Sequence, residues 1–312
     1  MLVQLEEWHP EDIRTVYRHF PLLTIHDKAS LAGQAAEAAG AQGSFWAMHD
    51  VLFTQYNEWT GLSPEEFKQW LNIAAEELEL DVQRFQNDIE SGRYAAEMED
   101  AFFQGIASGI LATPFLFLNG SLYQVEPSLT NLEAYIRLEL LTKAQYDRYP
   151  PMTLEDDVQY IARIELEIGE IIIQLYPELA PLAVNNFIFL AQEGWFEGNP
   201  FHRIVPGVYI ESGDPTGTGL GGPGYYFDDE ISEALTFDDL GMVALSSSGP
   251  NTNGSQFFIT LAPLPELNNS RTIFGRLIDG LDLIKSLNAR QPLEDFLDPP
   301  EVVILSVTIE IR

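Results

Sequence analysis

Residues 249–258 read GPNTNGSQFF, and this stretch decides the fold of the second half of the chain. Its Gly, Pro and Asn residues are typical of a tight turn, and the apolar pair at its end favours a strand. Because side chains two residues apart on a strand share one face, Gln256 and Phe258 are expected to point the same way. Earlier in the chain, residues 201–207 read FHRIVPG, which sets Arg203 among apolar neighbours. Together the two stretches supply an apolar wall, an amide and a cation.

Both stretches resemble the active-site segments of the cyclophilins, which are peptidyl-prolyl cis/trans isomerases. The resemblance extends over about residues 159–312, and the hydrophobic pattern predicts further elements where that family has them. These are a hairpin around Gly169 (162–166 and 170–175), helices over 180–192 and 282–287, and a closing strand over 302–311. The resemblance implies an all-β, closed antiparallel barrel with two helices.

Rotation about an X-Pro bond is slow because amide resonance must be broken. An enzyme therefore has to grip the proline ring, hold the chain, and stabilise a twisted peptide whose nitrogen regains its lone pair. A guanidinium can donate to that nitrogen and stays protonated near neutrality. The resemblance assigns this catalytic role to Arg203, with Gln256 as the amide beside it. The competing interpretation is that Arg203 only pairs with an acid on the barrel surface.

The resemblance also implies a set of peptide-binding residues. They are Phe201, His202, Val208, Tyr209, Glu211, Ser246, Ser247, Phe258, Glu266, Leu267 and Arg271. Phe258 and Leu267 match the family as walls for the proline ring, whereas other positions depart from it. The family usually has Phe at 208, Met at 209, Gln at 211, Asn at 247, a large apolar residue such as Trp at 266, and His or Tyr at 271. Val208 removes part of the wall, which corresponds to about 1–2 kcal/mol of ring binding.

Glu211 is the most informative of these departures. On a strand it shares a face with Tyr209 and can reach Arg203, where it either orients the guanidinium or occupies its donors. The sequence leaves these two alternatives open. Glu266 and Arg271 are candidates for an ion pair at the rim, worth about 1 kcal/mol or less if exposed.

The first half carries helix and turn signals. Ser44, Ser63 and Asp81 are expected to cap helices that begin at the next residue, and Asn119-Gly120 predicts a hairpin turn. Residues 16–22, 45–50 and 112–115 resemble the DsbA-like branch of the thioredoxin fold, over about residues 5–142. The resemblance implies a helix-rich α/β domain with a cis bond before Pro114.

This thioredoxin-like half is expected to be incomplete, because the family's first strand and Cys-x-x-Cys segment belong upstream of Leu5. The chain contains no Cys, so we expect no thiol–disulfide exchange and interpret the half as a client-binding or scaffolding module. The Pro150-Pro151 pair favours a stiff extended connection. We therefore predict a multidomain chain: a DsbA-like domain at 1–148, a linker at 149–158 and the isomerase domain at 159–312.

The formal net charge of −32 argues against partners with phosphate backbones or anionic membrane surfaces. No apolar stretch is long enough to span a membrane, and the scattered His residues predict no metal site and no cofactor. Residues 228–230 and 238–239 are acidic and are interpreted as solvated turns, with Ca²⁺ binding as the lesser alternative. The Gly-rich residues 213–224 are interpreted as an irregular surface loop, since they lack a phosphate-loop pattern.

The main functional hypothesis is a peptidyl-prolyl isomerase that assists the folding of proline-containing peptides and unfolded protein clients. One alternative is a non-catalytic chaperone module whose altered pocket only holds proline peptides, and another is a scaffold. The DsbA-like half favours an extracytoplasmic location, in the cell envelope or secreted, with the cytoplasm as the alternative. Residues 1–7 do not have the pattern of a signal peptide.

Overall fold

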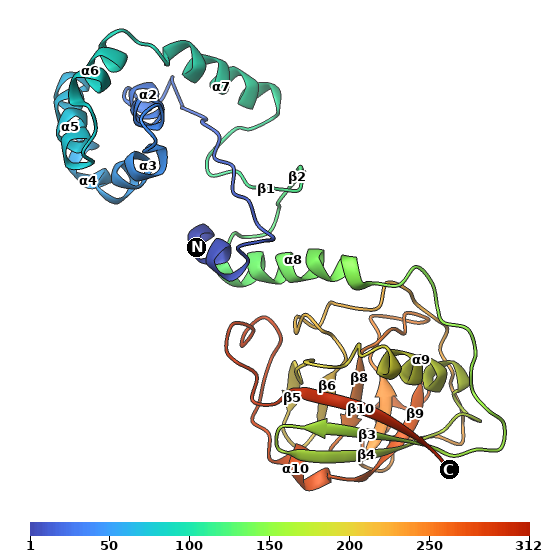
Figure 1. Ribbon diagram of the computed structural model, residues 1–312. Coiled ribbons are helices and arrows are strands. Elements are labelled where there is room, and N and C mark those ends of the chain that lie inside the picture. Colours follow the sequence, from blue (N-terminus) through green and yellow to red (C-terminus); the bar gives the residue numbers. More distant parts are fainter. The chain divides into compact units, whose positions relative to one another are not determined.

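The computed structural model describes residues 1–312 and divides into two compact units (Figure 1). One unit comprises residues 6–124, and the other comprises residues 1–5 together with residues 125–312. A short helix α1 (Leu2–Trp8) begins the chain. Residues 125–158 therefore group with the barrel by their contacts, while the domain limits expected from the sequence stay a prediction.

The unit of residues 6–124 is built mainly of helices. They are α2 (Ala29–Gly40), α3 (Phe45–Thr54), α4 (Tyr56–Trp59), α5 (Pro64–Glu77), α6 (Val82–Glu90) and α7 (Ala95–Ala107), followed by the strands β1 (Phe117–Leu118) and β2 (Ser121–Leu122). Small residues of α2, including Ala35 and Ala38, pack with Met48, Phe67 and Phe85 in its core. Because alanines lack bulk, neighbouring helices approach α2 closely.

Most of the local signals in this unit are confirmed. Ser63 and Glu66 form a reciprocal capping box at α5, and the Asp81 carboxylate accepts from the Arg84 amide at the start of α6. Residues 119 and 120 have φ angles of 49° and 81°, as a tight hairpin turn between β1 and β2 requires. The bond between Thr113 and Pro114 is cis, as expected.

Two details of the helical unit were not captured by the sequence. Ser44 occupies the N-cap position of α3, but its side chain makes no capping hydrogen bond, so that prediction was wrong. Helix α7 was not predicted either, because its sequence lacks a capping residue and its N-cap position is held by Tyr94.

The second unit contains an eight-stranded antiparallel sheet that curls into a barrel (Figure 1). Its strands are β3 (Tyr160–Leu166), β4 (Gly169–Leu175), β5 (Arg203–Val205), β6 (Tyr209–Ser212), β7 (Met242–Leu245), β8 (Phe257–Thr260), β9 (Ile273–Asp279) and β10 (Ile304–Ile311), in the order β10-β3-β4-β9-β7-β8-β6-β5. The helices of this unit are α8 (Leu129–Leu141), α9 (Pro181–Gln192) and α10 (Leu281–Lys285), with 3-10 turns at Thr142–Ala144 and Pro265–Leu267.

The two edge strands, β5 and β10, share no ladder. Isolated pairs between Pro200 and Val303 and between Ile204 and Arg290 link the residues beside them, and the Gly198 amide donates to the Ile304 carbonyl at 2.8 Å. The expected closed barrel is therefore present as a curled sheet whose seam is joined by single bridges.

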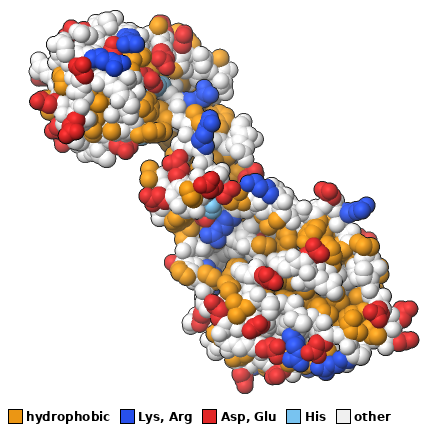
Figure 2. All heavy atoms as spheres, viewed as in Figure 1, with side chains coloured by type: hydrophobic (Ala, Val, Ile, Leu, Met, Phe, Trp, Pro, Cys, Tyr) orange, Lys and Arg blue, Asp and Glu red, His pale blue; other side chains and the backbone are white.

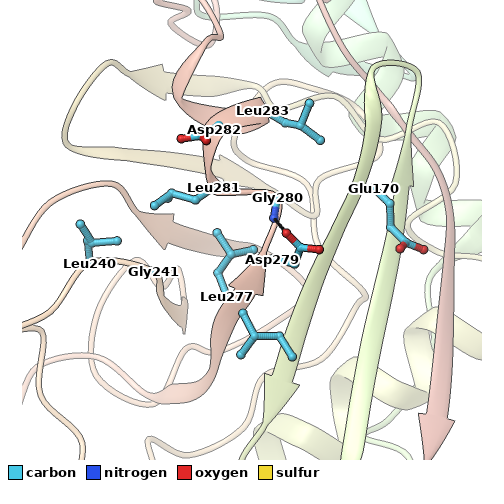
Figure 3. Close-up of a pocket in the computed structure, with 10 residues that line it drawn as sticks. Glu170, Leu240, Gly241, Leu277, Asp279, Gly280, Leu281, Asp282 and Leu283 are labelled. Atoms are coloured by element: carbon cyan, nitrogen blue, oxygen red, sulfur yellow. Dashed lines mark hydrogen bonds between the residues drawn. The ribbon is translucent and has the colours of Figure 1, made fainter.

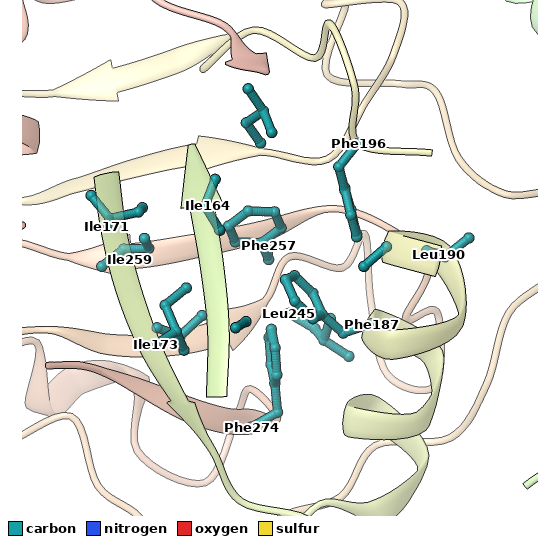
Figure 4. Packing of buried hydrophobic residues seen from close by; sticks show 14 of the residues in the cluster. Ile164, Ile171, Ile173, Phe187, Leu190, Phe196, Leu245, Phe257, Ile259 and Phe274 are labelled. Carbon is teal, nitrogen blue, oxygen red and sulfur yellow. The ribbon is translucent and has the colours of Figure 1, made fainter. Parts of the chain in front are cut away.

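Strand alternation sorts the barrel's apolar side chains into two clusters. Inside the barrel, Phe257 packs with Phe187 of α9 and with Phe196 and Phe274, as Figure 4 shows. The residues that alternate with these on β7 and β8, such as Ala244 and Phe258, point outward and form a smaller cluster. Its buried members are Phe237, Met242, Ala244, Phe258, Leu264 and Ile273. The outer cluster forms the wall of the candidate site.

Two residues of the acidic run 228–230 accept hydrogen bonds from other segments, which the sequence did not indicate. The Glu230 carboxylate accepts from the amides of Leu182 and Ala183 at 2.9 Å each, so it caps the first turn of α9. Asp229 accepts from the Asn251 amide and the Asn253 side chain at 2.9 Å. The interpretation as solvated turns was therefore wrong for these two residues, although Asp228, Asp238 and Asp239 are exposed.

The Gly-rich loop is also more ordered than expected. The Asp214 carboxylate is fully buried and accepts from the amides of Thr216, Leu220 and Gly221 and from the Thr218 hydroxyl. A buried carboxylate needs such donors because desolvation otherwise disfavours its charge. The loop has no helix or strand and exposes Leu220, as expected, but it is organised around the buried Asp214.

We expect Glu230→Ala to lower the stability of the barrel by about 1–2 kcal/mol, because two helix amides lose their acceptor. Calorimetric unfolding of the full chain measures the effect on the transition that contains the barrel. Glu233→Ala is the matched control, since Glu233 is an exposed acid of the same segment. Equal unfolding temperatures for the two variants would contradict the capping role.

Candidate active site

The candidate site is a row of side chains on the outer face of the barrel. In the antiparallel ladder, Arg203 of β5 lies opposite Glu211 of β6, and Glu211 lies opposite Phe258 of β8. Phe258 in turn lies opposite Ala244 of β7, which pairs with Ile273 of β9. Directly opposed residues share a face of the sheet. The row therefore brings a cation, an acid and an apolar wall together from strands that are distant in sequence.

Arg203 is held as a charged, accessible donor. Its Nε lies 3.6 Å from Oε2 of Glu211, and its side chain is 40% exposed. The hydroxyl of Tyr209 and the negative charge of Glu211 raise the pKa of Arg203, against the effect of partial burial. The guanidinium thus stays protonated, and its exposed part can meet a peptide.

Glu211 is buried, and its two oxygens have different neighbours. The Ser246 hydroxyl donates to Oε1, while Oε2 faces the Nε of Arg203. Oε1 also lies 4.0 Å from Nε2 of His202. The sequence expectation that Glu211 reaches Arg203 is confirmed, and the contact is at Nε.

An aromatic wall stands beside this ion pair. Phe258 is 6% exposed, and Phe237 stacks on it with ring centroids 5.8 Å apart. Tyr209 meets Phe258 edge to face at 5.9 Å, and Val208 and Leu267 pack against the same cluster. The sequence did not indicate Phe237 as a site residue, because it precedes the acidic pair Asp238-Asp239 in a loop and matches no motif. Its only signal was a bulky aromatic within a polar stretch.

The Gln256 side chain has a fixed orientation. Its Nε2 donates to the Gly221 carbonyl at 2.8 Å, while its oxygen and second N–H make no hydrogen bond to the protein. Ser247 lies partly exposed beside Ser246, at the end of β7. An amide and a segment of backbone thus flank the aromatic wall.

Several residues of the predicted set lie elsewhere. Phe201 is 1% exposed within the barrel core, and His202 is equally buried, so neither presents a surface to a bound peptide. Phe201 precedes β5 and packs into the core cluster inside the barrel. Glu266 is exposed at the 3-10 turn, and Arg271 donates to the Ser270 carbonyl. The suggested ion pair between Glu266 and Arg271 is not formed.

A cavity of about 510 Å³ lies away from this row, where β9 meets α10 (Figure 3). It is lined by Glu170, Leu240, Gly241, Leu277, Ile278, Asp279, Gly280, Leu281, Asp282 and Leu283. None of the predicted site residues borders it. No group of three His, Asp or Glu side chains is placed to bind a metal ion. None of the helices has the length and hydropathy needed to cross a bilayer.

Comparison with known proteins agrees with this geometry. The family model "Cyclophilin type peptidyl-prolyl cis-trans isomerase/CLD" matches residues 161–309. Peptidyl-prolyl cis-trans isomerase ppi1 of Schizosaccharomyces pombe is 48% identical over 132 residues, which are 41% of this chain and 85% of that protein. The chain belongs to the cyclophilin-type peptidyl-prolyl cis-trans isomerases.

Other relatives extend the comparison. Peptidyl-prolyl cis-trans isomerase CYP18-2 of Arabidopsis thaliana is 42% identical over 151 residues, covering 47% of this chain and 91% of its own. A crystal structure of a Cryptosporidium parvum cyclophilin type isomerase is 38% identical, with a TM-score of 0.44, and covers 49% of this chain and 98% of its own. A thioredoxin family model matches residues 5–137. The chain is thus an isomerase of the cyclophilin type with a thioredoxin-like region before it.

The burial of His202 predicts a dependence of stability on pH. Burial lowers its pKa, because desolvation and the nearby Arg203 and Arg290 outweigh the attraction of Glu211 and Asp214. As the pH falls below about 6.5, the unfolded chain binds a proton that the folded His202 does not, so stability falls. The loss attributable to one such group is at most about 1.4 kcal/mol per pH unit.

We therefore expect the free energy of unfolding to fall less steeply between pH 7 and pH 5.5 in His202→Gln than in the unsubstituted chain. The other titrating groups are common to both proteins, so they cancel in the difference. Urea unfolding at several pH values measures this difference. Parallel pH profiles would show that His202 is protonated in the folded barrel.

Proposed function

We propose that Arg203 is the catalytic cation of this isomerase and that Phe258 supplies the wall against which the proline ring lies. The observation that carries the proposal is the cross-strand row that sets the Arg203 guanidinium beside the Phe258 wall. With the ring held, rotation about the X-Pro bond moves the preceding carbonyl. Donation from the guanidinium to the imide nitrogen stabilises the twisted state, in which that nitrogen has its lone pair.

Gln256 completes this proposal as the group that grips the peptide backbone. Its Nε2 bond to the Gly221 carbonyl fixes the amide, and the remaining oxygen can accept from a peptide N–H. Holding one side of the X-Pro bond is necessary, because a free chain would follow the rotating group. Val208, in place of a larger wall residue, favours a weaker grip on the ring and reduced activity.

The alternative is a non-catalytic module that only binds proline peptides. Val208, the acid at Glu211 and the exposed Glu266 support it, because each departs from the pocket that the family usually has. NMR exchange spectroscopy on a short Ala-Pro-Phe peptide distinguishes the two. Peptide resonances that broaden on binding, without faster cis/trans exchange of the Ala-Pro bond, would favour the binding module.

The thioredoxin-like unit is proposed to bind unfolded clients without redox chemistry. Large apolar side chains lie exposed on it, and Figure 2 shows hydrophobic side chains at its surface. Tyr17, Trp46 and Phe53 contact His49 as one aromatic group, and they are 39%, 49% and 64% exposed. Such a group suits apolar segments of unfolded chains. An extracytoplasmic location is part of the same proposal.

Arg203→Ala should lower kcat/KM on a proline peptide at least about 100-fold, as expected when one transition-state donor is lost. Arg276→Ala is the matched control, because Arg276 is similarly exposed and lies 3.5 Å from Asp239. Arg203→Lys should restore only part of the activity, since an ammonium lacks the planar donor fork. Unchanged catalysis in Arg203→Ala would exclude the proposed mechanism.

Glu211→Gln should raise kcat/KM by up to roughly fivefold, as expected from an ion pair worth about 1 kcal/mol. The amide can still accept from Arg203 and contact Ser246, but it no longer offsets the charge of the guanidinium. Glu233→Gln changes the net charge equally outside the site and serves as the control. A fall in kcat/KM would instead make the Glu211 carboxylate an essential orienting partner of Arg203.

A further inference from the structure

Helix α8 and the residues after it pack on the barrel unit. Leu141, the last residue of α8, is part of the barrel's core cluster, and Tyr146 packs partly buried against the same core. The guanidinium of Arg137 lies 4.6 Å from the ring centre of Phe296, and its Nε donates to Glu133 at 2.7 Å. These contacts fix α8 with respect to the strands.

Gln145 and Tyr146, which follow α8, donate hydrogen bonds to successive residues of the Gly-rich loop. The Nε2 of Gln145 donates to the Gly222 carbonyl at 2.9 Å, and the Tyr146 amide donates to the Pro223 carbonyl at 2.8 Å. A Cβ added at Gly224 would lie 2.6 Å from the Tyr146 carbonyl oxygen, so only glycine permits this approach. The loop is thus held from outside by one side-chain and one backbone hydrogen bond.

Gly221 connects these hydrogen bonds to the candidate site. Its amide donates to the Asp214 carboxylate at 3.0 Å, and its carbonyl accepts from the Gln256 side chain at 2.8 Å. A Cβ at this position would lie 3.0 Å from a methyl carbon of Leu141. One glycine therefore lies beside the end of α8 and accepts from a proposed peptide-binding amide.

We propose that residues 137–146 are a positioning clamp that fixes the Gly221 carbonyl and, through it, the orientation of Gln256. The proposal rests on the proposed function of Gln256 for its effect on catalysis. Gln145 is then a positioning residue, since it acts on the peptide only through the loop. The clamp residues precede the stretch that matches the cyclophilin family model, which covers residues 161–309.

The first test is isomerase activity of the full chain on an Ala-Pro-Phe peptide. We expect Gln145→Ala to lower kcat/KM roughly fivefold, the effect of one lost hydrogen bond. Gln145 is exposed, so its replacement leaves the fold intact. Gln159→Ala is the matched control, because Gln159 is also exposed and its side chain makes no hydrogen bond in the structure. Equal activity of the two variants would count against the clamp.

A double-mutant cycle separates positioning from general destabilisation. In a Gln256→Ala background, Gln145→Ala should cause no further loss, because the group that it positions is gone. The same fivefold loss in both backgrounds would overturn the proposal. Restoration by Gln145→Glu is not expected, since a carboxylate cannot donate to the Gly222 carbonyl.

A measurement that does not depend on catalysis tests the clamp separately from the proposed role of Gln256 in peptide binding. In full-length protein with ¹⁵N-labelled glutamine, the side-chain N–H resonances of Gln256 should shift in Gln145→Ala and stay in place in Gln159→Ala. Unshifted resonances would overturn the clamp. If they shift while Gln256→Ala retains full activity, the clamp stands and the proposed role of Gln256 in peptide binding is wrong.

Discussion

The site depends on the register of β5, β6 and β8. A slip of one residue between these strands would turn Arg203 and Phe258 to opposite faces, because side chains alternate along a strand. Gly213, directly after β6, fixes the register at one end. With φ at 95° it lies so close to Ser255 that a side chain would overlap the Ser255 carbonyl. The Ser255 hydroxyl and the Trp195 indole both donate to the Gly213 carbonyl, at 2.7 and 3.2 Å. The end of β6 is therefore fixed against the residues that precede β8, and Gln256 is the residue next to this contact.

The sequence predicted those parts of the fold that are encoded locally. The hairpin around Gly169, helix α9 and the caps at Ser63 and Asp81 were found because neighbouring residues determine them. The thioredoxin-like turn at 119–120 was found for the same reason. Alternation predicted that Gln256 and Phe258 share one face, and the resemblance to the family assigned Phe258 to the site.

The parts that the sequence could not predict depend on contacts between distant segments. Glu230 caps a helix about fifty residues earlier, and no local pattern distinguishes it from a solvated acid. Phe237 joins the wall only because its loop folds over β7 and β8. Phe201 was assigned to the peptide by resemblance, but the direction of its side chain depends on how the barrel closes. The roles of Asp214 and Gln145 likewise appear only when the loop is folded.

The electrostatics of the chain act at two different ranges. The net charge of −32 creates a negative field that favours basic clients at a distance. At the site, the buried Glu211 carboxylate lies 3.6 Å from the Nε of Arg203 and offsets part of its charge. In the proposed mechanism the value of Arg203 is as a directed donor, because Glu211 lies 3.6 Å from its Nε and 40% of its side chain stays exposed. In the proposed mechanism, the twisted bond is therefore stabilised by Arg203 and not by the net charge of the chain.

The connecting residues show how sequence outside the family match can influence the site. The predicted linker is bonded to α9, since the Tyr149 hydroxyl donates to the Leu182 carbonyl at 2.7 Å and the Thr153 amide donates to Asn185 at 2.8 Å. The Gly-rich loop lies between Gln145 and Tyr146, which donate to Gly222 and Pro223, and Gln256, which donates to Gly221. Glycines have no side chains with which to fix a conformation, so the loop takes its position from whatever packs on either side. Asp214 supplies that contact from within the barrel, and residues 137–146 supply it from a segment that precedes the matched domain. A change in that segment can therefore alter the orientation of Gln256 without altering any residue of the barrel.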